Sequence, residues 1–165
     1  MKKTLSFFLF LFFLSPALRA DISVQDLGKK FQVPSAQWKK DNPNMSDKEF
    51  LMMESIKLGK ALTISGRTDD IPMDAKTYLN QIRGYLLNDK KTYPNARITS
   101  AQSKNLFGKD WQMIRVETPD GLQQELWCRK LDATQVVLFL YTSVGEAFKN
   151  FHADFDKILE QGAAI

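Results

Sequence analysis

The sequence predicts an α+β protein: an α/β/α sandwich in which a mainly antiparallel sheet of about six to seven strands carries helices on both faces. Residues 111–142 contain three apolar runs separated only by tight-turn residues, and the third run, 136–141, is apolar at every position. A strand of that kind is buried on both faces. Two further segments, 74–87 and 147–159, place apolar residues at helical spacing and can supply the covering layers.

The first twenty residues are predicted to be a signal peptide, which leaves 21–165 as a single mature domain. Lys2 and Lys3 precede an apolar stretch, 5–14, and small residues follow it. Cleavage is expected after Ala20, with Ala17 as the alternative. An apolar stretch of about ten residues is half of a bilayer span, so no stable transmembrane anchor is expected. The predicted location is the periplasm or the extracellular space.

The mature chain is expected to begin with a short strand at 26–34, ended by Pro34. A polar loop, 35–49, follows and carries Trp38. This side chain is expected to fold back onto the sheet edge, and the alternative is a tryptophan that binds a partner. Strands at 50–56 and 61–67 then form a hairpin around Gly59.

The first long helix, 74–87, is predicted to begin at Asp74 as N-cap. Gly84 lies inside this helix, which we interpret as a sign of close packing on the sheet. A strand at 96–103 and a turn at 105–109 lead into the strands 111–118, 122–131 and 136–141.

The last helix, 147–159, is preceded by Ser143 and Glu146, a capping-box pattern, and a frayed tail is expected at 162–165. Cys128, the only cysteine, shares a strand face with Leu126 and is predicted to be a buried apolar side chain.

Charge argues against a nucleic-acid partner. Lys2, Lys3 and Arg19 leave with the signal peptide, so 20 of the 23 basic residues remain against 19 acidic ones, a net charge of +1. Most of the basic balance therefore belongs to the signal. The lysines of the mature chain are interpreted as solvation and edge-strand protection, and contact with a membrane surface is not expected. They include Lys39, Lys40, Lys57, Lys60, Lys90 and Lys91.

No catalytic, metal-binding or cofactor-binding residues are predicted. His152 is the only histidine, which excludes zinc sites that need two imidazoles, and it lies beside Phe151 on the last helix as a boundary residue. The chain has no Gly-rich phosphate loop and no Gly-x-Ser-x-Gly motif.

Asp69, Asp70 and Trp38 are the candidate partner-binding residues. The two aspartates precede the first long helix, where acidic side chains complement the helix dipole. The alternative functions for the pair are an acidic docking patch for a basic partner and a weak Ca²⁺ contact.

The chain resembles the Mog/PsbP-like domains, which include the periplasmic DcrB-like proteins. The resemblance rests on Phe31-Gln32-Val33-Pro34 followed by Trp38-Lys39, on the long first helix, and on the hairpins and Phe-rich last helix. Those families often carry a glycine just before the tryptophan, where this chain has Ala36-Gln37. The resemblance implies an α/β/α sandwich and binding rather than catalysis, since related members act through protein surfaces on the oxygen-evolving complex or the GTPase Ran.

The expected function is therefore that of an exported, soluble, non-catalytic module that binds an as yet unknown protein partner, either in the periplasm or as a secreted effector-type factor. The alternative is a hydrolase or ligand-binding protein whose pocket is assembled from scattered residues. A deep polar pocket would favour the alternative, and a flat face of aromatic and charged residues would favour the module.

Overall fold

The computed structural model describes residues 24–40 and 47–165, so the predicted signal peptide, 1–20, lies outside the described residues. The helices are α1 (Val24–Lys30), α2 (Ala75–Asn88), α3 (Ala147–Asn150) and α4 (His152–Ala163). The strands are β1 (Trp38–Lys40), β2 (Glu49–Ser55), β3 (Gly59–Asp70), β4 (Arg97–Leu106), β5 (Lys109–Glu117), β6 (Leu122–Lys130) and β7 (Gln135–Val144).

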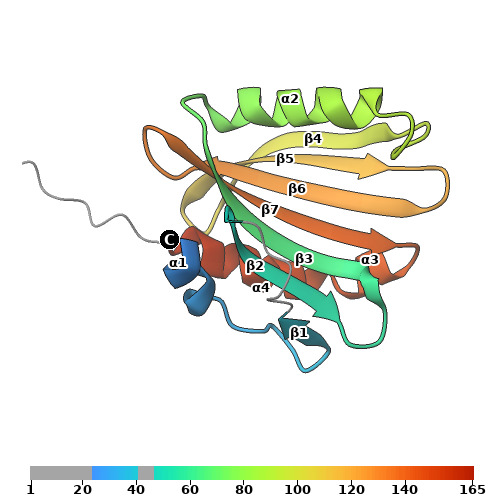
Figure 1. The fold of residues 1–165 in the computed structure, drawn as a ribbon, viewed down its shortest axis with the longest axis horizontal. Coiled ribbons are helices and arrows are strands. Elements are labelled where there is room, and N and C mark those ends of the chain that lie inside the picture. The colour runs from blue at the N-terminus through green and yellow to red at the C-terminus, as the bar shows by residue number, and fades with distance from the viewer. Residues whose placement is uncertain (1–23, 41–46) are drawn as a thin grey trace, which may run out of the picture.

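These strands form one seven-stranded antiparallel sheet in the order β1-β2-β3-β7-β6-β5-β4. Helix α2 lies over one face, and α1, α3 and α4 pack on the other (Figure 1). The predicted α/β/α sandwich with an antiparallel sheet is confirmed. None of the helices in the described part of the chain has the length and apolar character needed to cross a membrane.

Strand β7 occupies the middle of the sheet, between β3 and β6. Its side chains alternate between two cores: Val137 and Phe139 belong to the core on the α4 side, and Val136 and Leu138 to the core beneath α2. All four are at most 5% exposed. The prediction that this strand is covered on both sides is confirmed.

The core on the α4 side is built around the ring of Phe139. Its centroid lies 5.6 Å from that of Phe31, 5.7 Å from that of Phe50 and 5.9 Å from that of Trp111. Helix α4 comes close because it presents Gly162 to this ring: a Cβ there would lie 2.6 Å from Phe139 Cζ. The sheet and α4 therefore meet with no room for a side chain at this point.

Helix α2 begins where the sequence predicts. The Asp74 carboxylate accepts a hydrogen bond from the Thr77 backbone N–H at 2.9 Å and from the Thr77 hydroxyl at 2.7 Å. Its buried face packs in the same core as Cys128, which is fully buried. This burial confirms the prediction of a core cysteine, and it raises the pKa of the Cys128 thiol to about 12.

Two predictions near the start of the domain are wrong. The predicted strand at 26–34 begins as helix α1. Leu27 and Phe31 are four residues apart and both buried, which is the spacing of a helix face, but one such pair is too short to identify a helix from sequence. The predicted polar loop contains strand β1, in which Trp38 pairs with Ser55.

The predictions for the end of the chain also need correction. Ser143 does not cap a helix, because it belongs to β7 and pairs with Gln123. Glu146 is the N-cap of α3 and makes no side-chain capping bond. The expected frayed tail at 162–165 is wrong at its start, since α4 continues to Ala163, and Gly162 and Ala163 are buried.

Gly84 and Gly162 are expected to respond in opposite ways to alanine. A Cβ at Gly84 meets nothing within 4 Å, so the interpretation of close packing there is wrong. Gly84→Ala should raise the free energy of unfolding by about 0.5 to 1 kcal/mol, because alanine loses less backbone entropy in a helix. Gly162→Ala should lower it by about 1 to 3 kcal/mol through overlap with the buried Phe139 ring. Urea unfolding followed by circular dichroism measures both, and equal effects would contradict the packing described here.

Candidate functional site

Trp38 is an internal anchor of the fold. It is 4% exposed, and its indole N–H donates to Asp154 Oδ2 of α4 at 2.9 Å. The same carboxylate accepts from the Ser35 hydroxyl at 2.8 Å and from Lys157 Nζ at 3.0 Å. Burial opposes ionisation of Asp154, but these hydrogen bonds outweigh it and lower the pKa of the carboxyl. Trp38 thus fastens β1 to α4 and offers little surface to a partner.

Asp69 fastens β3 to α2. Its carboxylate accepts a hydrogen bond from the Tyr78 hydroxyl and lies 2.9 Å from Arg67 Nε, while Arg67 Nη2 donates to the Tyr78 oxygen at 2.9 Å. Burial and the bond to Asp69 together raise the pKa of Tyr78 to about 12. Asp69 is buried, whereas Asp70 is exposed and accepts from Gln135 Nε2 at 2.7 Å.

The structure does not bring Trp38, Asp69 and Asp70 into one site. Trp38 pairs with Ser55, which pairs with Gly59 at the start of β3, and the two aspartates lie at the other end of that strand. Asp69 and Asp70 follow each other along β3 and so point to opposite faces of the sheet. No group of three or more His, Cys, Asp and Glu side chains in the described residues is arranged to hold a metal ion.

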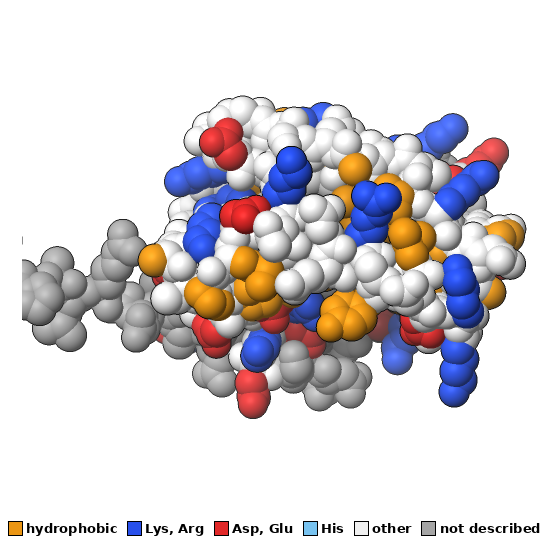
Figure 2. All heavy atoms as spheres, turned by 90° about the horizontal axis from the view of Figure 1, so that it is seen from above, with side chains coloured by type: hydrophobic (Ala, Val, Ile, Leu, Met, Phe, Trp, Pro, Cys, Tyr) orange, Lys and Arg blue, Asp and Glu red, His pale blue; other side chains and the backbone are white. Residues whose placement is uncertain are grey.

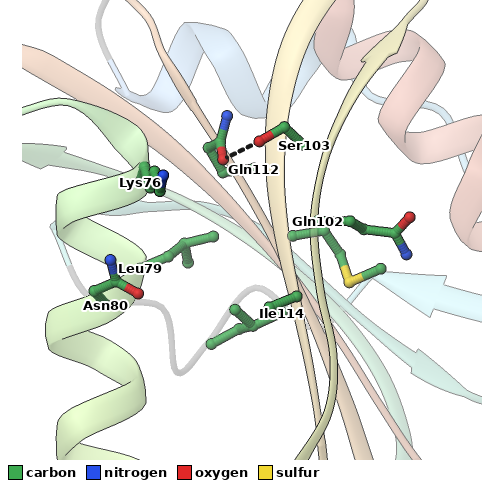
Figure 3. A pocket seen from close by; sticks show the side chains of 9 residues that line it. Lys76, Leu79, Asn80, Gln102, Ser103, Gln112 and Ile114 are labelled. Atoms are coloured by element: carbon green, nitrogen blue, oxygen red, sulfur yellow. Dashed lines mark hydrogen bonds between the residues drawn. The ribbon is translucent and has the colours of Figure 1, made fainter.

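A hollow of about 260 Å³ lies between α2 and the β4–β5 hairpin. Figure 3 shows Lys76, Leu79 and Asn80 approaching it from the helix, and Leu79 and Ile114 pointing toward each other across it. Ser103 Oγ donates to Gln112 Oε1 at 2.7 Å on the strand side. The remaining lining residues are Ala101, Gln102 and Met113.

The lining of the hollow combines an aliphatic base with hydrogen-bonding groups at its sides. It offers the Lys76 ammonium and the amides of Asn80 and Gln112, while the Gln102 side chain points away from the helix (Figure 3), and none of the lining residues is acidic. Ligand pockets generally enclose about 300 to 1,000 Å³. At about 260 Å³ the hollow matches one side chain of a bound chain better than a whole small molecule.

A second polar cluster, which the sequence analysis missed, surrounds Glu125 on the α4 side of the sheet. The Glu125 side chain is 1% exposed and accepts from Arg115 Nε at 2.9 Å and from Trp127 Nε1 at 2.6 Å. His152 Nε2 lies 3.1 Å from Glu125 Oε1, and His152 Nδ1 lies 3.3 Å from Asp156 Oδ2. Both ring nitrogens of His152 therefore face carboxylates, which is not the arrangement of a Ser-His-Asp triad.

One feature of the sequence could have indicated this cluster. Arg115 and Glu125 are charged residues inside two neighbouring apolar strands, and a hairpin register places them directly opposite each other, as the structure does. His152 joins them only through the packing of α4, which no local pattern encodes.

The charges in this cluster stabilise one another. Burial disfavours the Glu125 carboxylate, but hydrogen bonds from His152, Trp127 and Arg115 outweigh that effect and lower the pKa of Glu125 to about 2. The hydrogen bond to Glu125 in turn raises the pKa of His152. The cluster is a satisfied ionic network that holds α4 on the sheet.

Basic side chains are dispersed over the α2 side of the molecule. Figure 2 shows Lys and Arg side chains spread across this face, with small groups of apolar side chains between them. A nucleic-acid interface gathers its cations along a stripe or groove, which is not the distribution on this face.

The protein has an α+β fold that is similar to that of PsbP. Of the solved structures, the solution structure of cyanobacterial PsbP (CyanoP) from Synechocystis sp. PCC 6803 is similar, with a TM-score of 0.54 over 76% of this chain and 81% of that one. Sequence identity is 12%, so the likeness shows the fold alone. No protein-family model matches the chain, and no curated protein matches its sequence.

Replacing Glu125 and His152 should change how stability depends on pH. The pKa of Glu125 is about 2 against an ordinary value of 4.5, so its contribution is present above pH 4.5 and is lost as pH falls toward 2. Glu125→Gln should remove up to about 3 kcal/mol of unfolding free energy at neutral pH and flatten the acid limb. The pKa of His152 is raised, so its contribution is present below about pH 6.5 and is lost as pH rises. His152→Gln should therefore destabilise the protein at pH 6 and much less at pH 9.

Urea unfolding at intervals from pH 3 to pH 9 measures these profiles. Glu160→Gln is the matched control, because it removes an exposed carboxylate from α4, the helix that carries His152. It should leave the dependence of stability on pH unchanged. A wild-type profile in the Glu125→Gln protein would refute the network.

Proposed function

We propose that this chain is an exported, non-catalytic module that binds a protein partner by accepting an extended segment of that partner along β4. The supporting observation is the free outer edge of this strand. β4 is ten residues long, lies at the end of the sheet and pairs only with β5 among the described strands. Residues 101–105 are all exposed, and β4 contains no proline. An edge of this kind offers unpaired backbone donors and acceptors to an added strand.

The hollow beside β4 supplies a place for partner side chains. Ala101, Gln102 and Ser103 belong both to the exposed part of β4 and to the lining of the hollow. A strand added to β4 would lie about 4.8 Å further out, and every second side chain on it would point toward the α2 side. In this mode backbone hydrogen bonds give affinity, and the hollow discriminates among side chains.

A lysine and an irregularity in strand pairing limit unwanted pairing of β4 with other strands. Lys104 is exposed, and a register shift interrupts the pairing with β5 between Ile98 and Ser100. Lysines and bulges are the usual protection of an edge strand against self-association. The segment 101–103 lies between these two features and is the stretch best suited to a specific partner.

A small-molecule ligand is the second candidate, supported by the same hollow. Its lining of amides and one ammonium suits a small polar or anionic molecule. We favour the protein partner, since the hollow is small and opens beside a free strand edge.

The proposed setting is the periplasm or the outside of the cell, and kinship with DcrB-like periplasmic proteins is part of this proposal. The setting is supported by residues 1–20, where two lysines, an apolar stretch and small residues follow one another. The kinship is supported by the resemblance of Phe31-Gln32-Val33-Pro34 and Trp38-Lys39 to the opening of those domains.

Strand addition predicts where the partner protects the backbone. A partner captured from the envelope of the producing cell or from a host extract should slow hydrogen exchange of β4 amides in the purified complex, while amides of β1, the other edge strand, keep their rates. Gln102→Lys should weaken binding about tenfold, because it adds a cation to the exposed edge of β4 two residues from Lys104. Gln81→Lys, the same change at an exposed position of α2, is the matched control. Protection confined to other elements, or equal losses in the two variants, would contradict binding at β4.

Export predicts a shortened chain. Mass spectrometry of the protein recovered from the cell envelope or medium should give the mass of residues 21–165, with an N-terminal Asp21. Ala20→Lys should slow this processing, since the cleavage site requires small residues. A full-length protein that remains in the cytoplasm would refute export.

A further inference from the structure

The turn between β2 and β3 exposes aliphatic side chains. Ile56 is 60% exposed and Leu58 is 43% exposed. Val144, at the end of β7, is 40% exposed and lies at the same end of the sheet, because Thr142 of β7 pairs with Thr63 near the start of β3. Three of the large apolar side chains that the described residues leave in solvent therefore lie at one end of the molecule.

This turn holds its aliphatic side chains outward in a formed structure. The Ile56 backbone N–H donates to the Gln37 carbonyl at 2.8 Å, and the Leu58 N–H donates to Ser55 Oγ at 3.2 Å. Gly59 follows with φ +54°, a conformation that favours glycine. The exposed side chains are thus displayed on a fixed backbone, which lowers the entropy cost of binding through them.

Two lysines flank the aliphatic residues. Lys57 lies between Ile56 and Leu58, and Lys60 follows the turn; both are exposed. Neither forms a salt bridge within the described part of the chain. Aliphatic side chains beside unpaired lysines match the boundary of an anionic bilayer, where apolar groups enter the acyl region and ammonium groups meet headgroup phosphates.

The β4–β5 turn provides an internal comparison. Phe107 is 49% exposed there and Lys109 lies two residues further on, but the start of β5 also carries a carboxylate, Asp110, which accepts from Asn105 Nδ2 at 2.8 Å. The β2–β3 turn, residues 56–60, contains no acidic residue. Charge therefore distinguishes two turns that both expose apolar side chains.

We propose that the β2–β3 turn is a docking site for the surface of a bilayer that contains anionic lipid. Ile56 and Leu58 enter the interface, and Lys57 and Lys60 contact phosphate groups. The net charge of +1 expected for residues 21–165 does not reveal such a site, because membrane attraction depends on the charges near the surface and is screened beyond about 10 Å. Strands β7, β6 and β5 separate β3 from β4, so the docked protein keeps its partner-binding edge free.

Sedimentation with lipid vesicles tests this site. The probe is a vesicle of three parts phosphatidylcholine to one part phosphatidylglycerol, compared with phosphatidylcholine alone, and the protein is the chain as the cell exports it. Every variant carries the same N-terminus, so differences among variants report on the turn. Ile56→Ser/Leu58→Ser should reduce binding to the anionic vesicles at least tenfold, and Lys57→Gln/Lys60→Gln about fivefold per lysine. Phe107→Ser is the matched control at the other turn and should bind like wild type.

Wild-type binding to the anionic vesicles should also fall as salt is raised. Circular dichroism of each variant checks that the fold is intact. The proposal fails if the wild type does not sediment with anionic vesicles at low salt, or if Phe107→Ser loses as much binding as Ile56→Ser/Leu58→Ser. It also fails if the aliphatic variant keeps its vesicle binding but loses a protein partner, which would place a protein on the turn.

Discussion

The burial of β7 on both faces is the constraint on which the rest of the structure depends. Val137 and Phe139 need an apolar layer on one side, and Val136 and Leu138 need one on the other. Fully burying side chains of this size contributes about 1.5 to 3 kcal/mol each. The sheet therefore needs α2 above and the α1, α3 and α4 layer below, and Gly162 of α4 lets that layer approach the Phe139 ring.

Covering the sheet on both faces determines where its buried polar side chains find hydrogen-bond partners. A polar side chain in a covered sheet must be hydrogen-bonded, and here the partner often comes from a covering helix. Asp69 meets Tyr78 of α2, Trp38 meets Asp154 of α4, and Glu125 meets His152. Arg129 is buried too, and its Nη2 donates to the Gly162 carbonyl at 2.9 Å, near the negative end of the α4 dipole. Several residues whose side chains could take part in binding or catalysis therefore connect the sheet to its covering helices instead.

Surfaces for recognition remain where the layered packing ends. The outer edge of β4 has no neighbouring strand among the described residues, and the β2–β3 turn leaves Ile56 and Leu58 in solvent. Both expose groups that the fold leaves unpaired: backbone hydrogen-bonding groups in the first and aliphatic side chains with lysines in the second. A partner strand and a lipid surface are the chemistries that complement them.

Local sequence patterns determined the elements that are long and strongly periodic. The antiparallel strands, the α2 helix with its Asp74 cap, the burial of Cys128 and the two covering layers all follow from apolar spacing and turn residues. Patterns of only a few residues gave wrong predictions. The predicted strand that includes Leu27 and Phe31 begins as a helix, the predicted helix cap Ser143 lies in a strand, and the space beside Gly84 is open. Tertiary structure alone decided that Trp38 bonds Asp154 of α4, that Asp69 faces inward, that His152 reaches Glu125, and that β4 is an edge. These outcomes depend on which distant segments pack together, and a side chain acquires its exposure and partners only when that packing forms.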